Sequence, residues 1–356
     1  SVAAEADVLF NNALQWDSYR GGLRNPTFDL HRVALHEFGH VLGLDHPDEH
    51  DQKVVAIMNS TISNTESLQS DDINGAQSLY GNGPAYLSTL PAPALVNLST
   101  RAFVGTGDNI LIGGFIVQGS EPATIILRGI GHSLAADGIA TPLTDPVIEL
   151  RNSDNVLVGS SDDWFAQAGA QTIASYNLDP SNSREAALLK TLRPGNYTVL
   201  MRAFDAGDGD LTGIGIIELY DLHTSGGRAG NISSRGRVLA NNNIMIAGFI
   251  IGGGNSKEVV VRGLGPSLAK AGVRGSLPNP TLELRDASGT LIRANNDWQT
   301  DAEAAAVESS GLAPADQREA ALHANLNAGL YTALLRGANN TTGIGLVEVY
   351  DLSPVP

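Results

Sequence analysis

Two stretches near the start of the chain carry hydrophobic side chains at the spacing of a helix. The first begins at residue 30, and Asp29 just before it can cap its first turn. The second begins at Ser70 or Asp71, either of which can cap it, and ends at Gly81. The apolar positions of the first helix are Leu30, Val33, Leu35, Phe38 and Leu42. A strand is also predicted over residues 6–12, so this part of the chain is mixed α and β.

From residue 96 onward the hydrophobic positions follow the pattern of β-strands. Short runs rich in Ile, Val, Leu and Tyr are separated by Gly, Pro, Asn and Asp, as in strands joined by turns. The pattern occurs twice, because "REAAL" begins at Arg184 and again at Arg318, an offset of 134. Near the end of each copy the offset falls to 130, since the first copy carries a longer acidic loop. Each copy, with about seven or eight strands, is the size of a β-sandwich or jelly roll.

These patterns divide the chain into five segments. Residues 1–83 are predicted to form an α+β domain fragment. Residues 84–95, which contain several prolines, and residues 224–229 are predicted linkers. Residues 96–223 and 230–353 are predicted to be homologous all-β domains. The predicted fold class is therefore multidomain, with an α+β fragment followed by two β-sandwich or jelly-roll-like repeats.

Composition and charge exclude several kinds of partner. The formal net charge of −16 would repel nucleic-acid backbones, so we expect no nucleic-acid partner. No apolar run approaches the roughly 18 residues that span a bilayer, and the absence of cysteine excludes disulfides and thiolate metal sites. The first residues lack the basic start and apolar centre of a signal peptide. Either the protein is not exported, or the sequence begins after its targeting segment.

The stretch "HEFGHVLGLDH" carries the candidate metal ligands. His36 and His40 are four residues apart, so both imidazoles can face one ion from a helix. Gly43 can adopt a positive φ, end the helix and turn the chain back, which lets His46 approach the ion from another side. Three protein ligands and an open fourth position are typical of catalytic zinc. Glu37, beside the first ligand, can accept a proton from water that the metal activates.

This motif, HExxHxxGxxH with a methionine downstream, resembles the metzincin zinc peptidases. "VALHEFGHVLGLDHP" is similar to the matrixin branch, the matrix-metalloproteinase-like peptidases, and the resemblance covers about residues 5–81. The catalytic domain of that family normally extends further towards the N-terminus. The resemblance therefore implies a metzincin catalytic domain that is truncated at its start.

The resemblance also assigns roles to individual residues. It implies that Glu37 is the general base and that Met58, in "AIMNS", forms a packing floor beneath the metal. The implied zinc ligands are His36, His40 and His46. The implied wall of the S1′ substrate pocket begins with Asn59, Ser60 and Thr61.

Two other features of the repeats have alternative interpretations. An acidic loop in the first copy could bind Ca²⁺ through Asp205, Asp208 and Asp210, but the second copy lacks these residues, which favours a solvated loop. Calcium is therefore a candidate cofactor without an assigned site. Trp164 and Trp298 recur at equivalent positions, where a packed tryptophan is favoured over a carbohydrate-stacking one.

The sequence thus predicts a secreted, extracellular zinc metalloendopeptidase that hydrolyses internal bonds of protein or peptide substrates. Its tandem β domains are expected to bind an unidentified ligand or to associate with a surface. The alternative is a non-enzymatic extracellular binding or adhesion protein in which the zinc motif is a remnant. A purely structural zinc site is disfavoured, because structural zinc is usually coordinated by four protein ligands.

Overall fold

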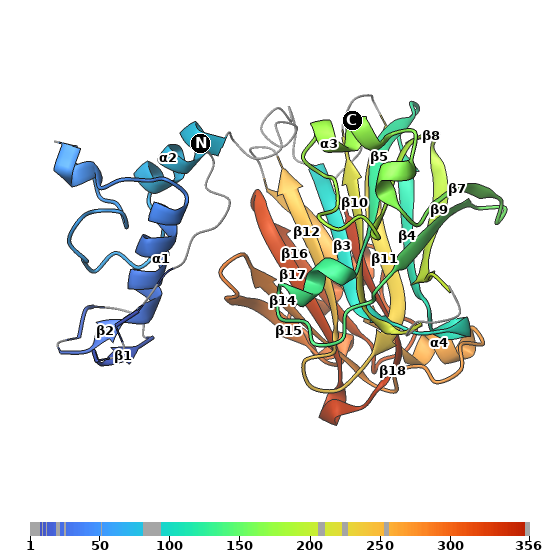
Figure 1. The fold of residues 1–356 in the computed structure, drawn as a ribbon. Coiled ribbons are helices and arrows are strands. Elements are labelled where there is room, and N and C mark those ends of the chain that lie inside the picture. Colours follow the sequence, from blue (N-terminus) through green and yellow to red (C-terminus); the bar gives the residue numbers. More distant parts are fainter. Residues whose placement is uncertain are drawn as a thin grey trace. The chain divides into compact units, whose positions relative to one another are not determined.

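The computed structural model separates the chain into two compact units, Ser1–Ala85 and Tyr86–Pro356 (Figure 1). The first unit contains both predicted helices, and the second is built mainly from strands, so the expected change from mixed structure to β structure is confirmed. No described helix is long and apolar enough to cross a membrane. The described residues are 8, 10–11, 13–18, 22–24, 26–50, 52–80, 94–205, 211–222, 227–252 and 256–352.

The N-terminal unit agrees with most of the predicted local structure. Its elements are the parallel strands β1 (Trp16–Asp17) and β2 (Phe28–Asp29), helix α1 (Leu30–Val41), the short 3-10 helix η1 (Pro47–His50) and helix α2 (Ser70–Tyr80). Asp29 caps α1 as predicted, because its side chain accepts a hydrogen bond of 3.0 Å from the backbone N–H of His31. The strand predicted over residues 6–12 is wrong where it can be checked, since residues 8, 10 and 11 are not in a strand.

The second unit contains both copies of the repeat. The first copy contributes β3 (Ala94–Val104), β4 (Leu111–Gln118), β5 (Ala123–Ile130), β6 (Pro146–Asn152), β7 (Leu157–Ser161), α3 (Ala170–Ser175), β8 (Ala186–Leu192), β9 (Gly195–Ala203) and β10 (Gly213–Asp221). The second copy contributes β11 (Arg228–Val238), β12 (Met245–Gly252), β13 (Lys257–Leu264), α4 (Pro266–Lys270), β14 (Pro280–Asp286), β15 (Leu291–Asn295), α5 (Ala304–Ser309), β16 (Ala320–Leu326), β17 (Gly329–Gly337) and β18 (Gly343–Asp351). Short 3-10 helices occupy several turns: η3 (Gly107–Asn109), η4 (His132–Ala135), η5 (Trp164–Ala166), η6 (Trp298–Thr300) and η7 (Ala338–Asn340).

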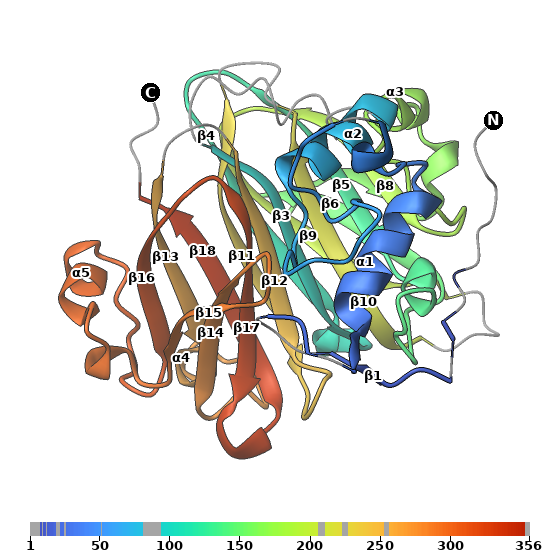
Figure 2. The ribbon, with the colours of Figure 1, turned by 90° about the vertical axis from the view of Figure 1, so that its left-hand side faces the viewer.

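Backbone pairing joins strands of the two copies into common sheets. One series runs β15, β14, β17, β12, β3, β10, β5, β8, and the other runs β7, β6, β9, β4, β11, β18, β13, β16. In each series the strands of one copy continue directly into those of the other, as Figure 2 shows. Strands β3 and β4 would be sheet edges in an isolated first copy. In this structure β3 pairs with β12 and β4 pairs with β11, which removes edges that could pair with other chains.

The two copies meet about an approximate two-fold axis. Thr100 and Ser234 occupy equivalent positions in the repeat, are completely buried, and join their hydroxyl groups at 2.7 Å. Phe103 pairs with its own equivalent, Arg237, and this pair links the two series of strands. Contacts between equivalent residues are expected where a two-fold axis passes. The duplication has therefore produced an internal pseudo-dimer.

This arrangement differs from the prediction of two separate domains. The structure does not divide the chain at residues 224–229, since Arg228 and Ala229 already belong to β11 and pair with β4. The predicted linker over 84–95 also ends inside β3, while most of it lies outside the described residues. The physical reason is that edge strands of one copy pair with edge strands of the other. Because the two copies have similar sequences, the sequence does not show whether a strand pairs within its own copy or with the other copy.

One hydrophobic core runs through both copies. Buried apolar side chains alternate with outward-facing positions along the strands, as in β4 and β12. Strands of the two series also face each other closely. A Cβ at Gly129 would lie 2.6 Å from Cγ2 of Ile148, and one at the equivalent Gly263 would lie 2.7 Å from Cδ1 of Leu335. At this place in each copy, a larger residue would fit only if the facing side chain, Ile148 or Leu335, shifted.

Candidate metal centre

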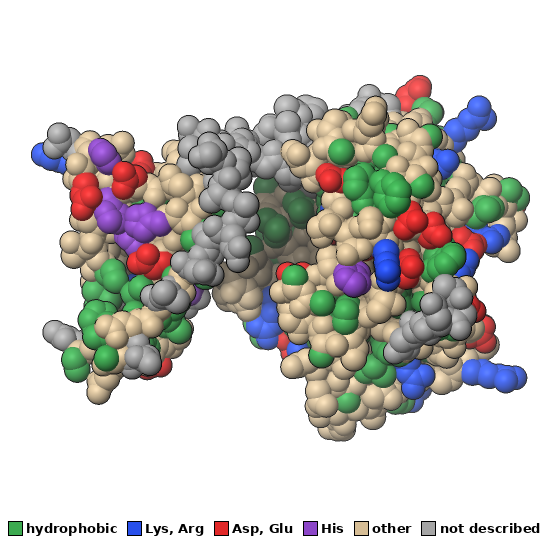
Figure 3. Space-filling model, viewed as in Figure 1, with side chains coloured by type: hydrophobic (Ala, Val, Ile, Leu, Met, Phe, Trp, Pro, Cys, Tyr) green, Lys and Arg blue, Asp and Glu red, His purple; other side chains and the backbone are tan. Residues whose placement is uncertain are grey.

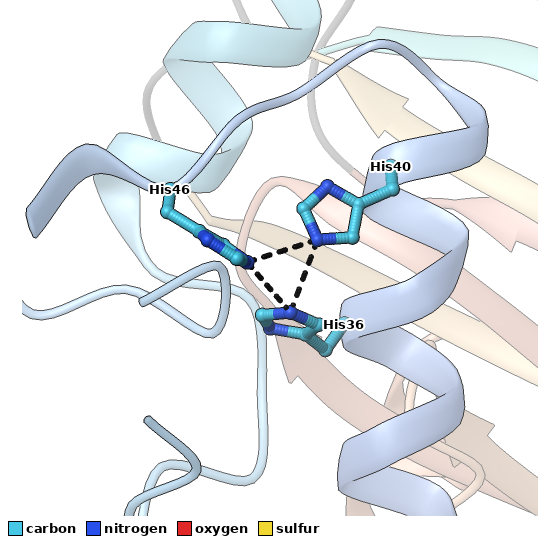
Figure 4. A group of neighbouring side chains, drawn as sticks. All are labelled: His36, His40 and His46. Atoms are coloured by element: carbon cyan, nitrogen blue, oxygen red, sulfur yellow. Dashed lines mark hydrogen bonds between the residues drawn. The ribbon is translucent and has the colours of Figure 1, made fainter. Parts of the chain in front are cut away.

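Three histidines of the N-terminal unit bring one ring nitrogen each to a common point. The Nε2 atoms of His36 and His40, both on α1, are 3.2 Å apart. The Nε2 atom of His46 lies 3.2 Å from that of His36 and 3.0 Å from that of His40. Figure 4 shows the three rings pointing inward, and Figure 3 shows histidine side chains gathered on one face of this unit. The structure thus brings together the three residues that the sequence predicts as ligands.

The end of α1 turns the third histidine towards the other two. Gly43 has φ +84°, a conformation that side-chain-bearing residues rarely adopt. Its N–H donates to the carbonyl of His40 at 2.8 Å, and the N–H of Leu44 donates to that of Gly39 at 3.0 Å. This pair of hydrogen bonds is the Schellman motif that ends many helices. The role that the sequence predicts for Gly43 is therefore confirmed by the backbone geometry.

The outer ring nitrogen of each histidine lies near an oxygen acceptor. Nδ1 of His36 lies 2.8 Å from the carbonyl oxygen of Ile57, and Nδ1 of His40 lies 2.8 Å from that of Leu44. Nδ1 of His46 lies 3.3 Å from the carboxylate of Glu49. Carbonyl and carboxylate oxygens can only accept, so Nδ1 is the donor in each contact, and a neutral ring then presents a lone pair on Nε2.

This arrangement suits a metal ion. Three lone pairs cannot hydrogen-bond to one another, so their convergence is favourable when a cation lies between them. Three nitrogens around tetrahedral zinc, at about 2.05 Å from the ion, are about 3.3 Å apart, close to the distances between the three Nε2 atoms. The donor set also fits, since neutral imidazole is a common zinc ligand.

The turn that contains Met58 (residues 56–60, the methionine turn) packs against α1 behind the histidines. Met58 is 2% exposed, and a Cβ at Gly39 would lie only 2.1 Å from its Sδ atom. Gly39 therefore allows Met58 to approach the helix between the two ligands that α1 provides. The sequence identified Met58 by resemblance but did not single out Gly39. The position of Gly39 between His36 and His40 in the sequence was the signal that could have identified it.

Asp72 connects α2 to the methionine turn. Its buried carboxylate accepts hydrogen bonds from the backbone N–H groups of Ile57 at 3.0 Å, Met58 at 3.1 Å and Gln69 at 2.7 Å. The carbonyl of Ile57 in turn accepts from His36. Asp72 thus holds the peptide that orients a ligand, a function that the sequence did not predict because the acidic start of α2 indicated only helix capping.

Glu37 follows His36 on α1 and is half-buried. Within the described part of the chain its carboxylate forms no hydrogen bond or ion pair.

The three residues predicted for the S1′ wall follow Met58 directly. The backbone N–H and hydroxyl of Ser60 donate to Asp48 at 2.8 and 2.7 Å, and the side-chain amide of Asn59 donates to the carbonyl of Val54 at 3.0 Å. Thr61 is exposed. The first two side chains thus serve to hold the loop.

The remaining predictions from the repeats have mixed outcomes. Trp298 is 8% exposed and belongs to a small apolar cluster, and Trp164 packs beside another, so the packed interpretation is favoured over carbohydrate stacking. Asp208 and Asp210 lie outside the described residues, so the preference for a solvated loop over a calcium site in the acidic loop stays a prediction.

Comparisons with known proteins agree with this geometry. The matrixin family model matches residues 2–81. The chain is 39% identical over 88 residues to macrophage metalloelastase of Oryctolagus cuniculus, which is 24% of this chain and 18% of that protein. It is 41% identical over 110 residues to stromelysin-3 of Mus musculus (30% and 20%), and 40% identical over 73 residues to metalloendoproteinase 4-MMP of Arabidopsis thaliana (20% and 21%). The N-terminal unit is thus similar to a zinc-dependent metallopeptidase family.

The extent of these matches is limited. The chain spans about a fifth of the length of the relatives that it matches. A solved structure from Sulfolobus Turreted Icosahedral Virus aligns with 74% of this chain and 88% of its own, at 10% identity and a TM-score of 0.19, too low to support a conclusion about the fold.

Proposed function

We propose that the protein is a zinc-dependent metalloendopeptidase of matrixin type. The observation that carries this proposal is the convergence of three Nε2 lone pairs whose Nδ1 atoms all face acceptors. A site of three neutral imidazoles leaves one position open on a tetrahedral ion, as catalysis requires. The similarity of residues 2–81 to matrixins supports the same family.

The residues of the site divide the chemistry between them. His36, His40 and His46 would hold zinc, which when bound lowers the pKa of a coordinated water towards about 7 and polarises the substrate carbonyl. The carboxylate of Glu37 accepts the proton of the attacking water and delivers it to the nitrogen of the leaving amine. Asn59, Ser60 and Thr61 begin the wall that contacts the substrate residue after the cleaved bond.

The repeats have a separate function in this proposal. They form a tandem β-sandwich unit that binds an unidentified ligand or associates with a surface, while the N-terminal unit cleaves protein or peptide substrates outside the cell. Their pseudo-dimeric pairing supports a single rigid module.

The experiment is turnover of a protein substrate by the zinc-loaded chain and by Glu37→Ala. The wild type is expected to cleave internal bonds, and Glu37→Ala to lose about 10²–10⁴-fold in rate while it retains its zinc. Zinc retention shows that the loss is not caused by an empty site. Zinc binding without any turnover by the wild type would contradict the enzyme and favour the alternative, a binding or adhesion protein that retains the motif as a remnant.

A further inference from the structure

Arg32 is a buried cation one helical turn before His36 on α1. Its side chain is completely buried and forms an ion pair with the equally buried side chain of Asp29. A buried guanidinium is stable only when carboxylates and carbonyls satisfy its donors. Arg32 therefore needs further acceptors besides Asp29 for its N–H groups.

Those further partners come from the loop that follows the methionine turn. The Nη2 atom of Arg32 lies 3.1 Å from the carboxylate of Glu66 and 3.4 Å from the carbonyl oxygen of Asn64. Beside it, Nε2 of His31 lies 3.0 Å from the carbonyl oxygen of Glu66. The N–H of Leu23 donates to the side chain of Asn64 at 2.9 Å. The first turn of α1 thus holds the far end of this loop.

The near end of the same loop is held separately. Ser60 donates two hydrogen bonds to Asp48, which lies in η1 just after His46. Between these two attachments the loop contains mainly exposed side chains, with no buried apolar residue among positions 60–66. Polar contacts therefore fix its path, and Arg32 supplies the buried charge at one end.

We propose that Arg32 is a positioning residue for substrate selection, because it fixes the S1′ wall through Asn64 and Glu66. This inference rests on the proposed peptidase function, since the loop is the wall of a substrate pocket only in that case. Arg32 contacts no substrate. It acts from the same helix that carries two ligands, so the wall and the metal share one support.

The test uses Glu66→Ala in the intact chain, because Glu66 is 32% exposed at its side chain and the variant is expected to fold. Glu283→Ala is the matched control, since Glu283 is 29% exposed and pairs with Arg285 in the other unit. The first readout is hydrogen exchange of the backbone amides of residues 60–66. The second is the ratio of kcat/KM for two peptides that differ only in the residue after the cleaved bond.

We expect Glu66→Ala to speed exchange in the loop and to lower the selectivity ratio by about tenfold, mainly through KM, with zinc content unchanged. Arg32→Met is expected to have a larger effect of the same kind, and Arg32→Lys a smaller one because it retains the charge. Glu283→Ala should change neither readout.

The outcomes separate this inference from the peptidase proposal. Unchanged exchange and an unchanged ratio in an active Glu66→Ala protein would overturn the role of Arg32 and leave the peptidase proposal standing. A wild type without turnover, in which Glu66→Ala still speeds loop exchange, would overturn the peptidase proposal and substrate selection with it, and leave Arg32 as an anchor only.

Discussion

The two units of this protein are stabilised in different ways. In the second unit a single apolar cluster passes through both copies of the repeat, with Leu98, Phe249 and Leu335 almost inaccessible to solvent. In the N-terminal unit the described apolar side chains with little exposure are Pro47, Ala56, Ile57 and Met58. Its buried charged and polar side chains are Asp29, Arg32, His36 and Asp72. Polar contacts thus hold the candidate site, while apolar burial holds the repeats.

The surface of the N-terminal unit shows the same difference. Phe38, Val41 and Leu42 are 54%, 40% and 45% exposed. At 100° per residue they lie on the side of α1 opposite His36 and His40. One face of α1 is therefore exposed to solvent, and hydrogen bonds and ion pairs hold the side chains of the other face. The geometry of the candidate metal site therefore depends on a few carboxylates more than on a large core.

The largest effect should follow from Asp72→Ala. The substitution leaves two buried N–H groups and one partly buried N–H group without their acceptor, so we expect the N-terminal unit to lose about 4 kcal/mol of stability. Zinc affinity should fall about 10–100-fold, because the peptide that orients His36 is released. Thermal unfolding and competitive zinc titration measure both. Asp71→Ala is the neighbouring control, and an equal effect of both variants would contradict the assignment.

In the second unit an apolar substitution should be the damaging one. Leu335→Ala removes a completely buried side chain that packs beside Gly263, and we expect a loss of about 3 kcal/mol. Zinc binding should not change. If calorimetry shows that this variant also weakens zinc binding, the two units are coupled and the comparison fails.

Gly39→Ala tests how much the N-terminal unit depends on the close packing of Met58 against α1. The added methyl group must displace the Sδ atom of Met58, and overpacking of this kind costs about 2 kcal/mol. We expect a lower unfolding temperature and weaker zinc binding. Gly75→Ala in α2 is the control, because its Cβ would meet only the end of the flexible Leu44 side chain. A neutral Gly39→Ala variant would show that the methionine turn does not depend on close packing.

The smallest effect is a pH dependence in the repeats. The hydrogen bond from Arg151 is the main cause that lowers the pKa of Glu149 below its usual value. This stability is present above the unfolded pKa of about 4.3 and is lost as pH falls through the lower folded value. Solvent screening limits it to about 0.5 kcal/mol. Glu149→Gln should reduce stability at pH 7 but not at pH 2, and equal losses at both values would contradict the assignment.

The sequence could predict the convergence of the three histidines because the parts of this candidate site are local. His36, His40, Gly43 and His46 lie within three helical turns of one another, so helix periodicity and one positive φ determine their geometry. Asp72 and Arg32 could not be assigned in this way. Each has one partner three residues away, but the partners that give it its role in the site are distant in sequence. A charged residue at the start of a helix is also usually exposed.

The pairing of the repeats was unpredictable for a different reason. Strand β3 can pair with an equivalent strand of either copy, since the two copies have similar sequences. The strands themselves were recognisable from their composition. Which copy covers each edge depends on tertiary packing, which a repeat cannot encode locally.

X-ray absorption at the zinc edge of the purified chain tests the central claim most directly. We expect one tightly bound zinc ion with three imidazole nitrogens at about 2.0–2.1 Å and one oxygen ligand from solvent. In His46→Ala the number of imidazole ligands should fall. A chain that loses its zinc on dialysis, or a spectrum that His46→Ala leaves unchanged, would contradict it.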